Sequence, residues 1–282
     1  MLSYFQGCFL LPISSKFPSI MPTGSLLNFL SVPREALELY ERGTDWKPFT
    51  NRRCPESITE LVPWPEFSYD HIIQEYGSIL DTEFKWEDRY FGTQPQRVYP
   101  GKDSLRYTLG MDLEFYVKYA FKETFKQLAP ELSERDLVPI SLEAAYRAEP
   151  IKTYSPDLAF MASPLDGEYL TGASGPNRLP GGLKGSLKWK SDWGSSSAGE
   201  MEKRFCLLEL ARIHLYTERC GTRYGFILTD QELVAIKRDD TSGRIALSKA
   251  ILLTSGGTEL SVSLDLWYLG MLAAKSDWKV EA

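Results

Sequence analysis

Residues 155–161, Ser-Pro-Asp-Leu-Ala-Phe-Met, and residues 185–190, Gly-Ser-Leu-Lys-Trp-Lys, decide how this chain folds. The first stretch is an apolar run that begins directly after Asp157, as expected where a strand enters a buried sheet. The second stretch has lysines at alternate positions with a tryptophan between them. Because successive side chains of a strand point to opposite faces, we expect a strand that buries its apolar face and lines a cleft with its polar face.

Hydrophobic periodicity in the rest of the chain alternates between that of a helix and that of a strand. The clearest helix covers residues 110–128, where apolar residues recur every three or four positions and Pro130 follows. Residues 164–183 are rich in glycine and proline, which predicts a long loop or flap. We expect helices over residues 33–42, 69–80, 110–128, 198–220 and 261–274, a helical turn near residues 57–61, and strands over residues 137–147, 156–163, 183–193, 223–229, 232–237 and 244–253.

This order of elements predicts the fold class and the division of the chain. Runs of strands between helices are typical of α/β and α+β proteins with a mixed central sheet flanked by helices. We place this core in residues 106–282. Residues 1–105 contain many prolines and short periodic segments, and we expect a mainly helical and irregular N-terminal extension.

Composition and charge limit the function classes. Hydrophobic residues make up 43% of the chain and charged residues 25%, as in an ordinary globular protein. The net charge is −6 and the pI is about 5.2, whereas proteins that bind nucleic acid strongly are usually basic. The acidic balance therefore disfavours a nucleic-acid partner, although a local basic cluster would still permit one.

Cysteine and histidine usage argues against a zinc site and for a reducing compartment. The four cysteines are widely spaced without a C-x-x-C pair, and the chain has two histidines. We expect reduced thiols and an intracellular location, either cytoplasmic or nuclear. No window approaches the roughly 20 uninterrupted apolar residues that a membrane helix needs, so we expect no membrane partner.

The ordered set of motifs over residues 110–275 resembles the PD-(D/E)XK nuclease superfamily, and most closely its fungal nuclease-like members. Pro156 and Asp157 match the Pro-Asp motif of that superfamily, and residues 185–188 match its Gly-(Asp/Glu)-x-Lys motif. Glu114 falls where these proteins carry a carboxylate on the first core helix. Glu209 falls near the polar residue, usually glutamine, on the following helix. The resemblance implies a restriction-endonuclease-like core around the mixed sheet.

The resemblance also assigns roles to individual residues. It implies Mg²⁺, held by Asp157, Glu209 and Glu114 if a metal binds, because Mg²⁺ prefers oxygen ligands and activates a bound water. A nearby lysine would orient that water and offset charge in the transition state. We predict Asp157, Lys188, Glu209 and Lys190 as the catalytic residues, and Trp189, Ser186, Arg212 and Tyr224 as the substrate-binding residues.

One motif position departs from the superfamily, because Ser186 stands where an acidic residue is expected. A neutral hydroxyl does not replace a carboxylate as a strong Mg²⁺ ligand. Two repairs are open: Glu209 reaching across from its helix, or Glu143 pointing in from the neighbouring strand. Otherwise the active site is degenerate and the site has another use.

Each of these residues also has an ordinary interpretation. Asp157 at a strand entry can cap a turn, and Lys188 can be a solvated lysine. Arg212 follows Glu209 by three residues and can form a helix-surface ion pair with it. A basic rim of Lys184, Lys190, Lys203 and Arg204 is equally well a solvated face.

Three functions remain open at this point. The first is a Mg²⁺-dependent nuclease, supported by the motifs and opposed by Ser186 and by the acidic pI. The second is a non-catalytic pseudonuclease that binds nucleic acid or protein. The third is an enzyme that uses lysine and carboxylate acid-base chemistry on a small organic substrate, such as a cyclase or isomerase, in a pocket lined by aromatic side chains.

Overall fold

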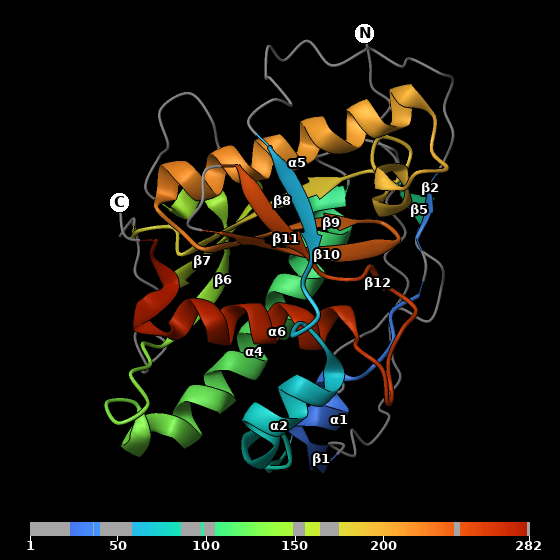
Figure 1. The fold of residues 1–282 in the computed structure, drawn as a ribbon. Helices are drawn as coiled ribbons and strands as arrows, with labels where there is room; N and C mark the ends of the chain where they lie inside the picture. The colour runs from blue at the N-terminus through green and yellow to red at the C-terminus, as the bar shows by residue number, and fades with distance from the viewer. Residues whose placement is uncertain are drawn as a thin grey trace, which may run out of the picture.

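The computed structural model of the chain describes residues 23–35, 37–39, 58–85, 97–98, 105–148, 156–163, 175–239 and 243–280. Within these ranges the chain forms a mixed central sheet with helices on both faces (Figure 1), which confirms the predicted α/β class. The helices are α1 (Leu26–Leu30), α2 (Tyr69–Leu80), α4 (Met111–Leu128), α5 (Glu200–Cys220) and α6 (Val262–Ala274). The strands are β1 (Thr23–Ser25), β2 (Glu38–Leu39), β3 (Glu60–Pro63), β4 (Glu83–Lys85), β5 (Arg97–Val98), β6 (Ile140–Ala144), β7 (Leu158–Ala162), β8 (Leu179–Lys184), β9 (Tyr224–Thr229), β10 (Glu232–Arg238), β11 (Arg244–Leu247) and β12 (Ile251–Leu252).

The main sheet has the strand order β3, β11, β10, β9, β8, β7, β6, and β12 pairs with β10. Strands β6, β7 and β8 are consecutive and antiparallel. The chain then passes through α5 and returns as β9, which lies parallel to β8. Strands β9, β10 and β11 are antiparallel, and β3 closes the sheet in parallel with β11. Strand β8 is therefore a central strand with a neighbour on each side.

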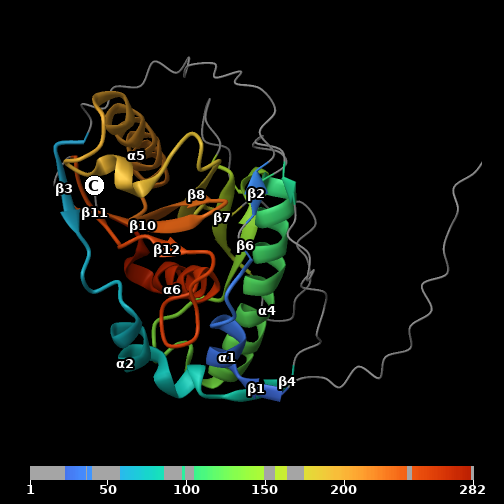
Figure 2. The ribbon, with the colours of Figure 1, turned by 90° about the vertical axis from the view of Figure 1, so that its right-hand side faces the viewer.

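Each face of the sheet has its own apolar core. On one face, α5 packs Leu210 and Ile213 against Ile227 and Val234 of the strands. On the other face, α6 and its neighbours α1, α2 and α4 form the larger core. Figure 1 shows α5 and α6 on opposite sides of the sheet, and Figure 2 shows α4 standing beside the β6 edge. The result is a three-layer arrangement, in which the α5 face of β8 faces away from the larger core.

Local sequence signals set the ends of the long helices. The hydroxyl oxygen of Ser261 accepts a hydrogen bond from the backbone N–H of Leu264 (3.1 Å), so Ser261 caps the start of α6. A carboxylate oxygen of Glu202 accepts from the N–H of Gly199 (2.8 Å) at the start of α5. Gly221 ends α5 with φ of 65°, a left-handed conformation that glycine adopts without strain.

The structure confirms most predicted elements. Helix α2 spans residues 69–80 as predicted, and α4, α5 and α6 differ from their predicted ranges by one or two residues at their starts. Strands β6, β7 and β9 lie within predicted ranges, and β10 runs one residue beyond its range. The single strand predicted over residues 244–253 is two strands, β11 and β12. Of the predicted flap over residues 164–183, residues 164–174 lie outside the described part of the chain.

Two predicted helical segments before residue 62 are wrong. No helix is present in the described residues 33–35 and 37–39, where β2 pairs with β5 instead. The N–H of Arg34 donates to the carbonyl of Leu253 (2.7 Å), which ties this stretch to the loop after β12. The predicted turn near residues 57–61 is replaced by β3, whose pairing with β11 satisfies its backbone groups.

The predicted strand over residues 183–193 is also wrong, because the strand comes earlier. Strand β8 ends at Lys184, and the N–H groups of Lys188 and Trp189 both donate to the carbonyl of Gly185, which closes a turn. Ser186, Lys188 and Lys190 therefore do not share one face of a strand. The true strand contains Pro-Gly-Gly, which the sequence alone indicates as a loop.

Segments before residue 106 take part in the main sheet and its larger core. Strand β3 belongs to the sheet, and α1 and α2 contribute Leu26, Phe29 and Ile72 to the core under α6. The division of the chain at residue 105 stays a prediction.

Across the ranges that the structure describes, none of the helices has both the length and the apolar composition that crossing a bilayer requires.

Candidate active site

Asp157 lies at the entry of β7 and joins β7 to β8. Its carboxylate Oδ2 accepts a hydrogen bond from the backbone N–H of Leu183 (2.9 Å), and its own N–H donates to the carbonyl of Gly181 (2.8 Å). The residue is only 2% exposed. The carboxylate is therefore fixed beside the last residues of β8.

Lys184 is the last residue of β8 and points to the sheet face that α5 covers. Its ammonium nitrogen lies 3.2 Å from Oε1 of Glu209 on α5, and the two side chains are 10% and 2% exposed. Burial and, to a lesser extent, the nearby guanidinium of Arg212 lower the pKa of Lys184 to about 8. The carboxylates of Glu209 and Asp157 oppose this shift without cancelling it.

Arg212 completes the group from the next turn of α5. Its Nη2 lies 3.0 Å from Oε2 of Glu209, which confirms the predicted i,i+3 ion pair, and its guanidinium lies 5.8 Å from the centre of the Tyr216 ring. Each carboxylate oxygen of Glu209 thus faces one cation. We refer to Asp157, Lys184, Glu209 and Arg212 as the β8–α5 site.

Gly182 explains how Arg212 can approach the sheet. A Cβ atom at Gly182 would lie 2.8 Å from Cδ1 of Ile213 and 3.2 Å from Nη2 of Arg212. Any longer side chain at this position would collide with α5. The guanidinium therefore occupies the space above β8 that a side chain two residues before Lys184 would need.

The residues of the predicted Gly-Ser-Leu-Lys-Trp-Lys motif lie outside the β8–α5 site. Ser186 is buried, and both its N–H and its hydroxyl donate to the carboxylate of Asp230, each at 2.6 Å. Lys188 is exposed in the turn after β8, and Lys190 is half-buried beyond it. The structure therefore replaces Lys188 by Lys184 as the lysine beside Asp157 and Glu209.

The two aromatic residues predicted to bind substrate are core residues. Trp189 is buried in the core under α5, next to Cys206. Tyr224 faces the opposite side of the sheet, where its ring stacks on Trp64 with centroids 5.8 Å apart. Their positions are explained by packing.

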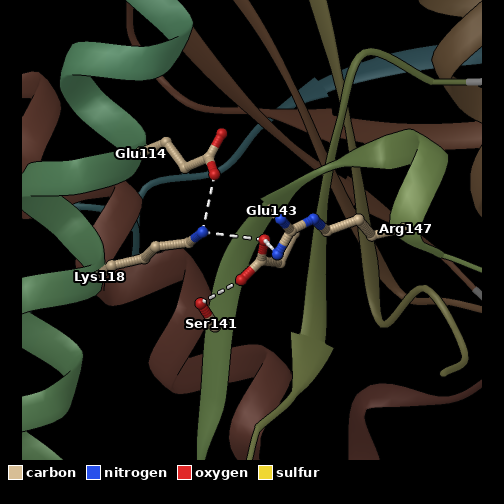
Figure 3. Close-up of polar contacts among 5 residues, drawn as sticks. All are labelled: Glu114, Lys118, Ser141, Glu143 and Arg147. Carbon is tan, nitrogen blue, oxygen red and sulfur yellow. Dashed lines mark hydrogen bonds and ion pairs between the residues drawn. The ribbon is translucent and has the colours of Figure 1, made fainter. Parts of the chain in front are cut away.

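Glu114 and Glu143 belong to a second charged cluster beside the β6 edge. The ammonium of Lys118 lies 2.7 Å from a carboxylate oxygen of Glu114 and 2.8 Å from one of Glu143, between the two (Figure 3). Glu143 also accepts from the Ser141 hydroxyl (2.9 Å) and pairs with Arg147 (3.2 Å). Glu143 is therefore already engaged by two cations, in what we call the Lys118 cluster.

The side chains of the β8–α5 site fit Mg²⁺ poorly. Mg²⁺ needs oxygen ligands that are open to it, but Glu209 already faces Lys184 and Arg212. The described residues contain no group of three or more His, Cys, Asp or Glu side chains placed to hold a metal ion. The chain itself supplies the positive charge beside Glu209.

Sequence reasoning did not select Lys184, which we expected in a solvated basic rim. That prediction is wrong because Lys184 lies on a central strand under α5 rather than on a surface loop. The one sequence signal for a strand here is that Gly182 and Lys184 stand two residues apart, as on one face of a strand. This signal is weak, because the surrounding Gly/Pro-rich segment resembles a turn more than a strand.

Comparison of the chain with protein-family models, with curated proteins and with solved structures found no match. The chemistry of the β8–α5 site therefore has to be inferred from its geometry.

Proposed function

We propose that residues 106–282 form a restriction-endonuclease-like core of the PD-(D/E)XK type. Its support is the order α4, β6, β7, β8, α5, β9, with β8 parallel to β9, together with Pro156-Asp157 at the entry of β7. A lysine follows on the adjacent strand, as the motif requires, but it is Lys184 and not Lys188. In this alignment the acidic motif position falls on Gly182.

The same alignment implies that this protein does not cleave phosphodiester bonds with a metal. The observation that carries the proposal is the contact between Gly182 and Arg212, because it puts a guanidinium where the motif carboxylate and its cation would be needed. Asp157 and Glu209 remain, but their charge is offset by Lys184 and Arg212. We assign the β8–α5 site to proton transfer on a small organic substrate instead.

Lys184 is the proton-transfer residue in this proposal. A general acid or base works best when its pKa lies near the working pH. With a pKa of about 8, Lys184 supplies both protonation states near neutral pH, unlike an ordinary lysine. Glu209 holds the ammonium in place, and Asp157 fixes β8 through Leu183.

A non-catalytic pseudonuclease is the second candidate. It is favoured by the way Glu209 pairs with two cations of the same chain, so that the charge of this carboxylate is balanced without a ligand. Buried groups with strongly shifted pKa values are more frequent at active sites, which is why we rank the enzyme first.

The test is to incubate a cell metabolite extract in D₂O with the full chain or with Lys184→Met, and to compare the products by mass spectrometry. We expect at least one small molecule to gain deuterium or to change its structure with the wild-type chain alone. Equal spectra for both proteins would overturn the enzymatic proposal and favour the pseudonuclease.

A second experiment tests for nuclease activity by incubating the chain with supercoiled plasmid DNA and Mg²⁺ or Mn²⁺. We expect no cleavage with either metal. Cleavage that both Asp157→Asn and Lys184→Met abolish would show that the site is a working nuclease, and would contradict the proposal.

A further inference from the structure

We infer that Arg212 binds a carboxylate group of the substrate, so that the β8–α5 site acts on an organic acid. This inference rests on the proposed function and names its substrate class.

Arg212 is buried, and two of its guanidinium nitrogens have no hydrogen-bond acceptor in the described chain. Its side chain is 10% exposed. Among the residues that the structure describes, neither Nε nor Nη2 has a hydrogen-bond acceptor, and the contact of Nη2 with Glu209 is an ion pair without hydrogen-bond alignment. A buried donor without an acceptor is energetically unfavourable, and a ligand that supplies the acceptor would account for it here.

Arg178, directly before β8, provides a comparison. Its Nε also has no acceptor in the described ranges, but its Nη1 donates to the carbonyl of Ala273 (3.1 Å) and its guanidinium lies 5.0 Å from the centre of the Trp278 ring. The contacts of Arg178 therefore join the start of β8 to the end of α6 and to Trp278. In the described part of the chain, the guanidinium of Arg212 instead pairs with a site residue, Glu209, and lies near the Tyr216 ring.

The donor pattern of arginine selects the ligand. A guanidinium presents parallel N–H groups that match the two oxygens of a carboxylate. Lys184 and Arg212 bring two positive charges to the site, and the carboxylates of Glu209 and Asp157 bring two negative charges. The site therefore has no excess positive charge, which disfavours a dianion such as a phosphate monoester more than a ligand with a single charge. A monocarboxylate therefore fits the site best.

The position of Lys184 gives this contact a role in the reaction. Lys184 and Arg212 face the two oxygens of one carboxylate, that of Glu209, at 3.2 and 3.0 Å. A substrate anchored on Arg212 would consequently place its neighbouring atoms beside the ammonium of Lys184. Arg212 is thus the binding residue, and Lys184 the proton-transfer residue.

The test uses the full chain with sodium benzoate as the probe, compared with sodium phosphate and sodium chloride at equal ionic strength. Acylation of Lys184 at pH 8 is followed by mass spectrometry. A carboxylate beside Lys184 favours its charged form, so benzoate should slow the acylation about fivefold. The effect should disappear in Arg212→Met and shrink in Arg212→Lys, which keeps the charge but loses the paired donors.

Arg204→Gln, an exposed position on the same helix, is the matched control and should keep the benzoate effect. Equal acylation rates in benzoate and chloride, or protection that survives in both Arg212 variants, would overturn the inference. The two proposals fail separately. Benzoate protection without proton exchange on any metabolite refutes the enzyme and leaves Arg212 as a carboxylate-binding residue, whereas Lys184-dependent exchange without benzoate protection refutes only the role of Arg212.

Discussion

Asp230 holds Ser186 through two hydrogen bonds, one from the backbone N–H and one from the hydroxyl, each 2.6 Å long. Five residues later Ser191 repeats this arrangement with Glu232, at 2.6 and 3.0 Å. The two carboxylates flank the turn between β9 and β10, so the two serines fix the segment after β8 to that hairpin. This contact explains why a serine is present at position 186.

Placing the acidic motif residue at position 186 should therefore damage the protein. Ser186→Asp would bury a second carboxylate against Asp230 and remove a donor, which we expect to destabilise the fold by about 3–5 kcal/mol. Ser186→Ala loses one hydrogen bond to a charged acceptor and should cost about 1.5–3 kcal/mol. Urea unfolding at pH 7 measures both. Metal binding by a stable Ser186→Asp variant would show instead that this position belongs to a metal site.

The depressed pKa of Lys184 makes a prediction about stability at alkaline pH. The folded state releases the proton at about pH 8 and the unfolded state near 10.5, so between these values the unfolded chain binds more protons. Stability conferred by position 184 must therefore rise with pH in this window. The wild-type chain should gain about 3 kcal/mol relative to Lys184→Met between pH 7 and pH 10.5.

The control for this experiment is Lys188→Met, since Lys188 is exposed in the turn after β8. The difference in unfolding free energy between Lys188→Met and the wild-type chain should stay constant over the same pH range. Chemical denaturation at several pH values gives both differences. A constant difference for Lys184→Met as well would mean that Lys184 titrates like an ordinary lysine, and the proposed proton transfer would lose its main support.

How much the sequence predicts depends on where the decisive contacts come from. Helices α2, α4, α5 and α6 are encoded by local periodicity and capping residues, so they are predictable from a short window. Strand β8 depends on contacts with residues far along the chain. A Cβ atom at Gly181 would lie 2.1 Å from the Phe226 ring, and one at Gly182 would meet Ile213. The glycines that indicate a loop are there because partners pack directly on the strand.

The candidate site follows the same rule. The positions of Asp157 at the start of β7 and of Glu209 on α5 were predictable, because each element has a clear local pattern. The lysine was misplaced by four residues because Lys188 and Lys190 imitate a strand, whereas the carbonyl of Gly185 accepts from two N–H groups and forms a turn. Arg212 pairs with Glu209 as predicted, but its close approach to the strand depends on the absence of a side chain at Gly182, which only the packing of α5 on β8 reveals.

The Lys118 cluster should contribute to stability through its central cation. Lys118→Met would leave the carboxylates of Glu114 and Glu143 without the ammonium that separates them. Both carboxylates are partly exposed, so we expect a modest loss of about 1–2 kcal/mol that decreases at high salt.

A double-mutant cycle with Glu143→Gln separates the pair from the single side chains. In a Glu143→Gln background, Lys118→Met should lower the free energy of unfolding by less, because the carboxylate of Glu114 no longer faces a second carboxylate. Thermal or urea unfolding of the four proteins gives the coupling. Strictly additive costs would indicate that the contact in Figure 3 contributes nothing to stability.

Asp265 on α6 predicts the opposite pH response from Lys184. It is fully buried, its two carboxyl oxygens have no hydrogen-bond partner in the described chain, and burial raises its pKa well above the ordinary value. The folded state therefore keeps a proton that the unfolded state releases above about pH 4, so this residue lowers stability as the pH rises from there towards its folded-state pKa.

Asp265→Asn has nearly the same shape but cannot ionise. We expect the variant to match the wild-type chain in urea near pH 4 and to have a higher unfolding midpoint at pH 8. An equal midpoint at both pH values would show that Asp265 is ionised in the folded protein and has a partner for its charge.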